Sequence, residues 1–129
     1  MIYVIDAHAL VWHLTNDAKL SIAAHTALSR IDAGKDKGIV PTIVLAEILY
    51  ASERGRIALT LDRVLEELQK RKHYRIESFT KAILVAAEKI KNVTELHDRL
   101  IVATAIRHKA FVITRDADIT NSGIVKVVW

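Results

Sequence analysis

Short apolar runs followed by acidic residues most constrain how this chain can fold. Ile2–Ile5 is followed directly by Asp6, and the apolar run at residues 110–114 leads to Asp116. Uninterrupted apolar runs of this length predict strands that are buried on both faces, as in a parallel sheet. The two runs therefore predict central strands that each end at a carboxylate.

Segments with helical periodicity lie between the apolar runs. Leu61, Val64, Leu65 and Leu68 recur at helical spacing after Thr60, a favourable N-cap residue. Similar patterns predict helices at residues 7–14, 21–31, 42–54, 80–90 and 98–108, with Ser21, Thr42 and Thr80 as caps and Asp98 as the first helical residue. Further strands are expected at residues 38–40, 73–77 and 124–128. This alternation predicts an α/β fold built from βαβ units around a mostly parallel sheet.

Three acids fall where such a sheet forms its sites, beyond the carboxyl ends of the strands. Asp6 and Asp116 follow strands, and Asp98 begins a helix near the same edge. Glu47 interrupts an apolar helix in which most of its neighbours are expected to be buried. A buried carboxylate is costly unless it is paired or bound to a cation, so Glu47 is expected to join the other three.

Each acid also has a simpler interpretation. Asp6 and Asp98 fit helix caps, and Asp116 and Asp118 fit turn-forming residues. Glu47 could lie on a narrow solvent-exposed face of its helix, together with Arg54.

Taken together, however, these interpretations require four independent placements of acids at one edge of one sheet. Packed carboxylates repel one another by about 4 kcal/mol per close pair at an effective dielectric constant near 20. Such a cluster calls for a cation, and hard oxygen ligands suit Mg²⁺ or Mn²⁺. These ions can activate a water molecule and stabilise the leaving oxygen of a phosphodiester.

Composition narrows the classes of function. At 129 residues the chain fits a single domain. Its net charge of +4 is compatible with a phosphate-backbone substrate, but on charge alone an ordinary lysine-rich surface is the first explanation. The absence of cysteine excludes disulfide scaffolds and thiolate metal sites. No apolar stretch has the length of a membrane span, and the N-terminal residues do not read as a signal peptide, so a cytoplasmic protein without membrane contact is expected.

Other catalytic motifs are missing. The six histidines have no zinc-site spacing, and no Walker loop, dinucleotide-binding glycine pattern or nucleophile elbow occurs. A haloacid-dehalogenase phosphatase is excluded because His8 stands where its second aspartate is needed. His97, Arg99 and Arg115 flank the acids and are candidates for contacts with RNA phosphates, with solvated surface as the alternative.

Four segments resemble a known family. In order and spacing they resemble the motifs of PIN-domain proteins, especially VapC-type toxins of toxin–antitoxin operons. The segments are residues 3–12 (YVIDAHALVW), 42–48, 98–105 and 112–116. The resemblance covers essentially the whole chain. It implies a three-layer α/β/α sandwich in which residues 1–129 form one PIN domain.

The same resemblance implies a function and a site. The expected function is that of the toxin of a type II, VapBC-like system, a Mg²⁺- or Mn²⁺-dependent endoribonuclease that hydrolyses RNA with a metal-activated water. A homodimer and a VapB-like antitoxin are its implied partners. The implied catalytic and metal-binding residues are Asp6, Glu47, Asp98 and Asp116, with Thr114 as a supporting hydroxyl and Asp118 as an accessory acid.

The chain departs from the family pattern at Ala7, where threonine or serine is common. Loss of that hydroxyl is expected to loosen the order around Asp6 without removing a metal ligand. Two alternative functions remain: a housekeeping PIN nuclease that matures ribosomal RNA, and a non-catalytic PIN-like module that binds RNA or protein. Ala7 is the only feature that favours the second alternative.

Overall fold

The computed structural model describes all 129 residues, and strands alternate with helices as the sequence predicts. In chain order the elements are β1 (Ile2–Ile5), α1 (Ala7–Leu14), α2 (Ile22–Asp32), β2 (Lys37–Pro41), α3 (Thr42–Glu53), α4 (Leu61–Gln69), β3 (Tyr74–Glu77), α5 (Lys81–Glu88), α6 (Leu96–His108), β4 (Phe111–Ile113), α7 (Ala117–Ser122) and β5 (Val127–Val128).

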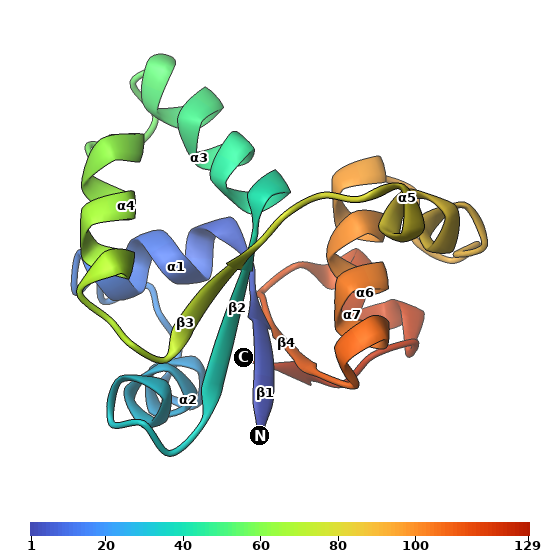
Figure 1. Cartoon of the computed structure of the whole chain (residues 1–129), viewed down its shortest axis with the longest axis horizontal. Coiled ribbons are helices and arrows are strands. Elements are labelled where there is room, and N and C mark those ends of the chain that lie inside the picture. Colours follow the sequence, from blue (N-terminus) through green and yellow to red (C-terminus); the bar gives the residue numbers. More distant parts are fainter.

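The five strands form one parallel sheet in the order β3-β2-β1-β4-β5. Helices α1 to α4 cover one side of the sheet, and α5 to α7 cover the other (Figure 1). The structure therefore confirms the predicted α/β fold with helices on both sides of a parallel sheet. It also places the carboxyl ends of all five strands at one edge.

Burial of branched side chains explains why β1 and β4 lie next to each other in the sheet. Val4 and Ile5 on β1, and Val112 and Ile113 on β4, are completely buried. Full burial of such a side chain stabilises the fold by about 1.5–3 kcal/mol relative to exposure. The acid that follows each strand is thereby held at the margin of the hydrophobic core.

Several local predictions are corrected by the structure. Thr42 is the first residue of α3 but does not cap it, because the N-cap position is Pro41 and the Thr42 hydroxyl instead accepts a hydrogen bond from the Phe79 amide at 2.9 Å. The last strand is limited to Val127–Val128. Helix α7 was not predicted, since its six residues are too few to show a periodic pattern.

No helix in the structure combines the length and the hydrophobicity that crossing a membrane requires.

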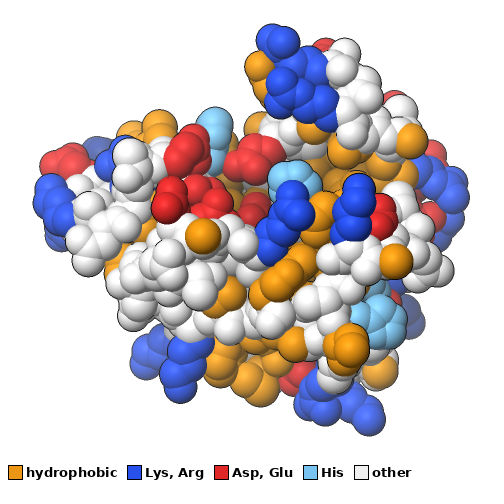
Figure 2. All heavy atoms as spheres, turned by 180° about the vertical axis from the view of Figure 1, so that it is seen from behind, with side chains coloured by type: hydrophobic (Ala, Val, Ile, Leu, Met, Phe, Trp, Pro, Cys, Tyr) orange, Lys and Arg blue, Asp and Glu red, His pale blue; other side chains and the backbone are white.

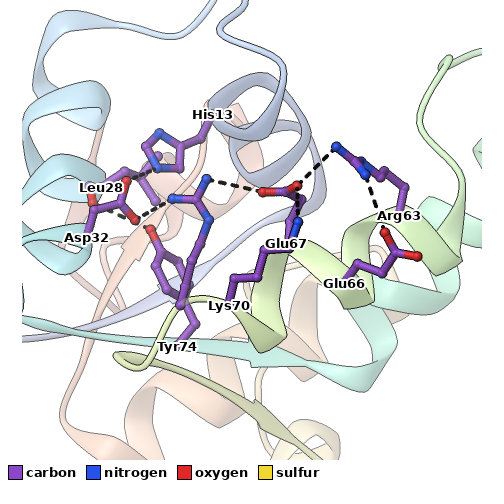
Figure 3. Close-up of polar contacts among 9 residues, drawn as sticks. His13, Leu28, Asp32, Arg63, Glu66, Glu67, Lys70 and Tyr74 are labelled. Atoms are coloured by element: carbon purple, nitrogen blue, oxygen red, sulfur yellow. Dashed lines mark hydrogen bonds and ion pairs between the residues drawn. The ribbon is translucent and has the colours of Figure 1, made fainter.

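A charged network ties together the helices on one side of the sheet (Figure 3). Asp32 on α2 lies 2.9 Å from Nε2 of His13 on α1 and accepts a 2.9 Å hydrogen bond from Arg71, which precedes β3. Arg71 also pairs with Glu67 on α4. Burial lowers the pKa of His13, against the opposing effect of Asp32. Burial would raise the pKa of Asp32, but the hydrogen bond from Arg71 and the charge on His13 outweigh it and lower that pKa.

We therefore expect Asp32→Ala to destabilise the protein by about 1–3 kcal/mol, the range for losing hydrogen bonds to charged partners. Glu66→Ala is the matched control, because Glu66 forms only an exposed pair with Arg63 at 3.3 Å, and it should cost less than about 0.5 kcal/mol. Urea unfolding at pH 7 measures both. Equal losses in the two variants would show that the network around Asp32 contributes no more than a surface pair.

Candidate active site

A chain of hydrogen bonds joins the two acids that follow β1 and β4. The Thr114 hydroxyl donates to Oδ2 of Asp6 at 2.6 Å and accepts from the Asp116 amide at 3.0 Å. Thr114 is completely buried, so its hydroxyl has little freedom to turn elsewhere. Asp6, Thr114 and Asp116 thus lie together at the carboxyl edge of the sheet, as the sequence predicted.

Asp6 and Asp116 also cap helices. Asp6 is the N-cap of α1 and its Oδ1 accepts from the Ala7 amide at 2.7 Å. Asp116 is the N-cap of α7 and its Oδ1 accepts from the Ile119 amide at 3.0 Å. The capping interpretation of Asp6 is therefore correct without excluding a role in the site. Both Asp6 oxygens are oriented, one by Thr114 and one by the backbone of Ala7, so the hydroxyl missing at position 7 does not leave Asp6 without partners.

Asp98 occupies a different position from the one predicted. Helix α6 begins at Leu96, and Glu95 is its N-cap, whose carboxylate accepts from the Asp98 amide at 2.9 Å. Asp98 is the third helical residue, so the prediction that it starts or caps the helix is wrong. Its carboxylate is consequently not used for capping.

Glu47 lies in the middle of α3, and its surroundings also differ from the prediction. Ala46, Leu49 and Tyr50 are exposed, so only part of the helix is buried. The Glu47 side chain retains 29% exposure, and its Oε1 is 3.9 Å from Nδ1 of His97, which also lies 3.0 Å from Glu95. Glu47 therefore faces the start of α6, where Asp98 lies.

The electrostatics show that the four acids share one region. Burial raises the pKa of Glu47 to about 8, with further increases from four negative charges, those of Asp6, Asp98, Glu95 and Asp116. Burial raises the pKa of Asp98 to about 7, with further increases from Asp116, Asp6, Glu95 and Asp118. Acidic side chains gather on one face of the molecule, with histidines beside them (Figure 2). Glu95 belongs to this cluster but was missed, because glutamate is not a typical N-cap residue and nothing else in the sequence distinguished it.

The positions of the acidic side chains limit how many of them can contact one metal ion without rearrangement. No group of three or more His, Cys, Asp or Glu side chains lies close enough to hold a metal ion. The donor chemistry nevertheless suits Mg²⁺, which is commonly bound through one or two carboxylates while it keeps several water molecules. Binding through more than two of these acids would require their side chains to rotate towards one another.

The remaining predicted residues lie around the cluster. Asp118 is exposed in the first turn of α7. Arg99, one residue after Asp98, has a buried Nε atom without a hydrogen-bond partner. The Arg115 guanidinium lies over the Trp12 ring, 4.6 Å from its centroid. Asp118 contributes to the raised pKa of Asp98, and Arg99 and Arg115 each lie next to one of the acids in the sequence.

A cleft of about 700 Å³ opens beside the acids, between α1 and α3. Glu47, His8, His97 and Arg115 line its end at the acidic cluster. Most of its lining residues are hydrophobic, and they include Trp12 and Tyr50. Sequence reasoning did not find this cleft, because it depends on which side chains of α3 remain unburied.

Comparisons with known proteins agree with the fold. Among solved structures, the chain is similar to VapBC2 from Rickettsia felis, bound to a DNA fragment from its promoter, with a TM-score of 0.73, 18% identity and coverage of 98% of this chain and 97% of that one. It is similar to Mycobacterium tuberculosis VapC20, a sarcin-ricin loop cleaving toxin, with a TM-score of 0.68, 18% identity and complete coverage of both chains. The PIN domain endonuclease Utp24 gives a TM-score of 0.52 at 19% identity, covering 94% of this chain and 75% of Utp24.

At these identities the structural likenesses establish the fold alone. No curated protein matches the sequence. A family model described as PIN domain matches residues 3–123, which is nearly the full length. The chain therefore belongs to the PIN domain family.

Proposed function

We propose that this protein is a divalent-metal-dependent endoribonuclease and the toxin of a VapBC-like toxin–antitoxin pair. The observation that carries the proposal is the convergence of Asp6, Glu47, Asp98 and Asp116 at the carboxyl edge of the sheet, where burial and the neighbouring negative charges raise the pKa values of Glu47 and Asp98. A cluster of uncompensated carboxylates beside a basic surface suits a cation and a phosphodiester.

In this proposal the four acids hold Mg²⁺ or Mn²⁺. When bound, the ion supplies positive charge that activates a water molecule and stabilises the leaving oxygen of the scissile phosphate. Thr114 holds Asp6 and Asp116 next to each other, because its hydroxyl donates to the Asp6 carboxylate and accepts from the Asp116 amide. We propose that His97, Arg99 and Arg115 contact RNA phosphates and that Asp118 acts as an accessory acid.

The toxin role is favoured over ribosomal RNA maturation by the extent of the structural likeness. VapBC2 and VapC20, the latter a sarcin-ricin loop cleaving toxin, match this chain over almost their full lengths. A cognate antitoxin would place a basic side chain among the acids and exclude RNA or metal, and the functional unit would be a homodimer.

The carboxylates are tested by substitutions that preserve the helix caps. Asp6→Asn and Asp116→Asn keep a side-chain carbonyl that can accept the capping hydrogen bonds, so the fold should be retained. Both variants should reduce Mn²⁺-dependent cleavage of RNA to background. The matched control is Asp62→Asn, which alters an exposed acid in the first turn of α4. Wild-type rates in the two site variants would refute the assignment.

Thr114→Val tests whether the buried hydroxyl orders the site. Valine has a similar shape but neither orients Asp6 nor accepts from the Asp116 amide. We expect a loss of about 10–100-fold in activity or metal affinity, as for other groups that orient metal ligands. Thr104→Val is the control, because Thr104 is equally buried but bonds only to the Leu100 carbonyl within α6. Equal effects in the two variants would indicate general damage to the core.

Glu47→Gln tests the electrostatic cost of the cluster in metal-free protein. Because the pKa of Glu47 is raised from 4.5 to about 8 on folding, the folded state binds a proton more tightly than the unfolded state. The stability contributed by that proton is complete below pH 4.5 and is lost as the pH rises towards 8.

Glu47→Gln should therefore change the Tm little at pH 5 and raise it by several degrees at pH 9. Glu53→Gln, which alters an exposed acid on the same helix, is the control and should show no such difference. Melting curves recorded in EDTA measure both variants. An unchanged or lower Tm for Glu47→Gln at pH 9 would contradict a repulsive cluster around Glu47.

A further inference from the structure

The cleft between α1 and α3 has an aromatic ring on each wall. Trp12 on α1 lines the cleft although it is almost fully buried, whereas Tyr50 on α3 is 52% exposed. Because aromatic faces are favourable stacking partners for any nucleobase, an exposed ring beside a phosphodiester site is a natural platform for an unpaired base.

Cations accompany both rings. Arg115 and Lys19 lie over Trp12, at 4.6 Å and 5.8 Å from its centroid. Arg56 lies 5.9 Å from the centroid of Tyr50. These three cations line the cleft, and Glu47 is its only acidic residue. The two rings therefore favour a flat occupant, and the cations favour an anionic one. A nucleotide has both properties, whereas an apolar helix has neither.

Helix geometry connects this cleft to the acids. Glu47, Tyr50 and Ala51 share one face of α3, because residues three and four positions apart are neighbours on a helix. Glu47 and Tyr50 are three residues apart, which corresponds to about 4.5 Å along the helix axis. In the space-filling view, basic and hydrophobic side chains adjoin the acidic ones on the same face (Figure 2).

We infer that this cleft is a nucleotide subsite in which an unpaired base next to the scissile phosphate stacks on Tyr50, while Lys19, Arg56 and Arg115 hold the adjoining phosphates. This inference rests on the proposed nuclease function and specifies its substrate as single-stranded RNA at the cleavage position. Tyr50 is a positioning residue, since it contacts a base and not the reacting phosphate. The volume of about 700 Å³ lies within the usual range for small-ligand sites.

Binding can be measured without cleavage in an Asp116→Asn background. The protein has two tryptophans, Trp12 and Trp129, whose ring centroids are 5.9 Å apart, so its tryptophan fluorescence reports on this cleft. The probes are deca-uridylate and inorganic polyphosphate of similar charge, which lacks bases. Tyr50→Leu should weaken deca-uridylate binding by about 5- to 150-fold, the range for losing one base–aromatic stack, and leave polyphosphate binding unchanged.

Two further variants make the test specific. Tyr50→Phe retains the ring and should bind deca-uridylate like the parent. Leu49→Ala alters the neighbouring exposed residue, which does not line the cleft, and should have no effect. In the active protein, Tyr50→Leu should raise KM for single-stranded RNA with little change in kcat, as expected when binding is lost without altered chemistry.

The outcomes separate this inference from the function on which it rests. Cleavage by wild-type protein with an unchanged KM in Tyr50→Leu would overturn the subsite and leave the nuclease proposal intact. Failure of wild-type protein to cleave any RNA with Mn²⁺, together with no binding of deca-uridylate, would overturn both. If Tyr50→Leu binds deca-uridylate normally but no longer binds the cognate antitoxin, the cleft belongs to a protein partner and the inference is wrong.

Discussion

Parallel pairing of β1 with β4 is the constraint on which the acidic site depends. The register places Ile5 opposite Ile113, so the next residues, Asp6 and Thr114, emerge side by side at the end of the sheet. Their hydrogen bond spans 108 residues of sequence and forms only when the two strands are paired. Because four branched side chains in these strands are completely buried, a one-residue slip would disrupt their packing and separate Asp6 from Thr114 at the same time. Core packing and site geometry are therefore fixed by the same contact.

The four acids are stabilised by the fold to different extents. Asp6 and Asp116 lie at helix N-termini, and each accepts a backbone hydrogen bond there. Glu47 lies in the middle of a helix and has only the distant contact with His97. The raised pKa values of Glu47 and Asp98 show where negative charge lacks compensation. The region that would gain most from a cation is consequently the space between α3 and the start of α6.

The sequence was most informative where strand ends coincide with acids. A run of buried residues followed by aspartate fixes both the strand and the edge on which the carboxylate lies, so Asp6 and Asp116 could be placed from local pattern alone. The start of α6 could not be placed in this way, because aspartate is the more typical N-cap residue, whereas the backbone uses Glu95 as the cap. Helix α7 is too short to show a periodic pattern in the sequence. The hydrogen bond of the Thr42 hydroxyl joins two residues that are far apart in the sequence, so no local pattern indicates it.

Helix α3 shows the main limit of periodicity. Its apolar residues suggested burial on nearly all sides, yet Leu49 and Tyr50 are exposed, because only Val44, Leu45 and Ile48 face the core. Apolar surface left in contact with water is costly unless it serves an interaction. Here Arg54 lies 4.4 Å from the centroid of Tyr50, which covers part of the ring by a cation–π contact. Three other cations near the aromatic rings, Lys19, Arg56 and Arg115, line the cleft and give it positive charge. A molecule that replaces water in the cleft therefore has to be compatible with that charge.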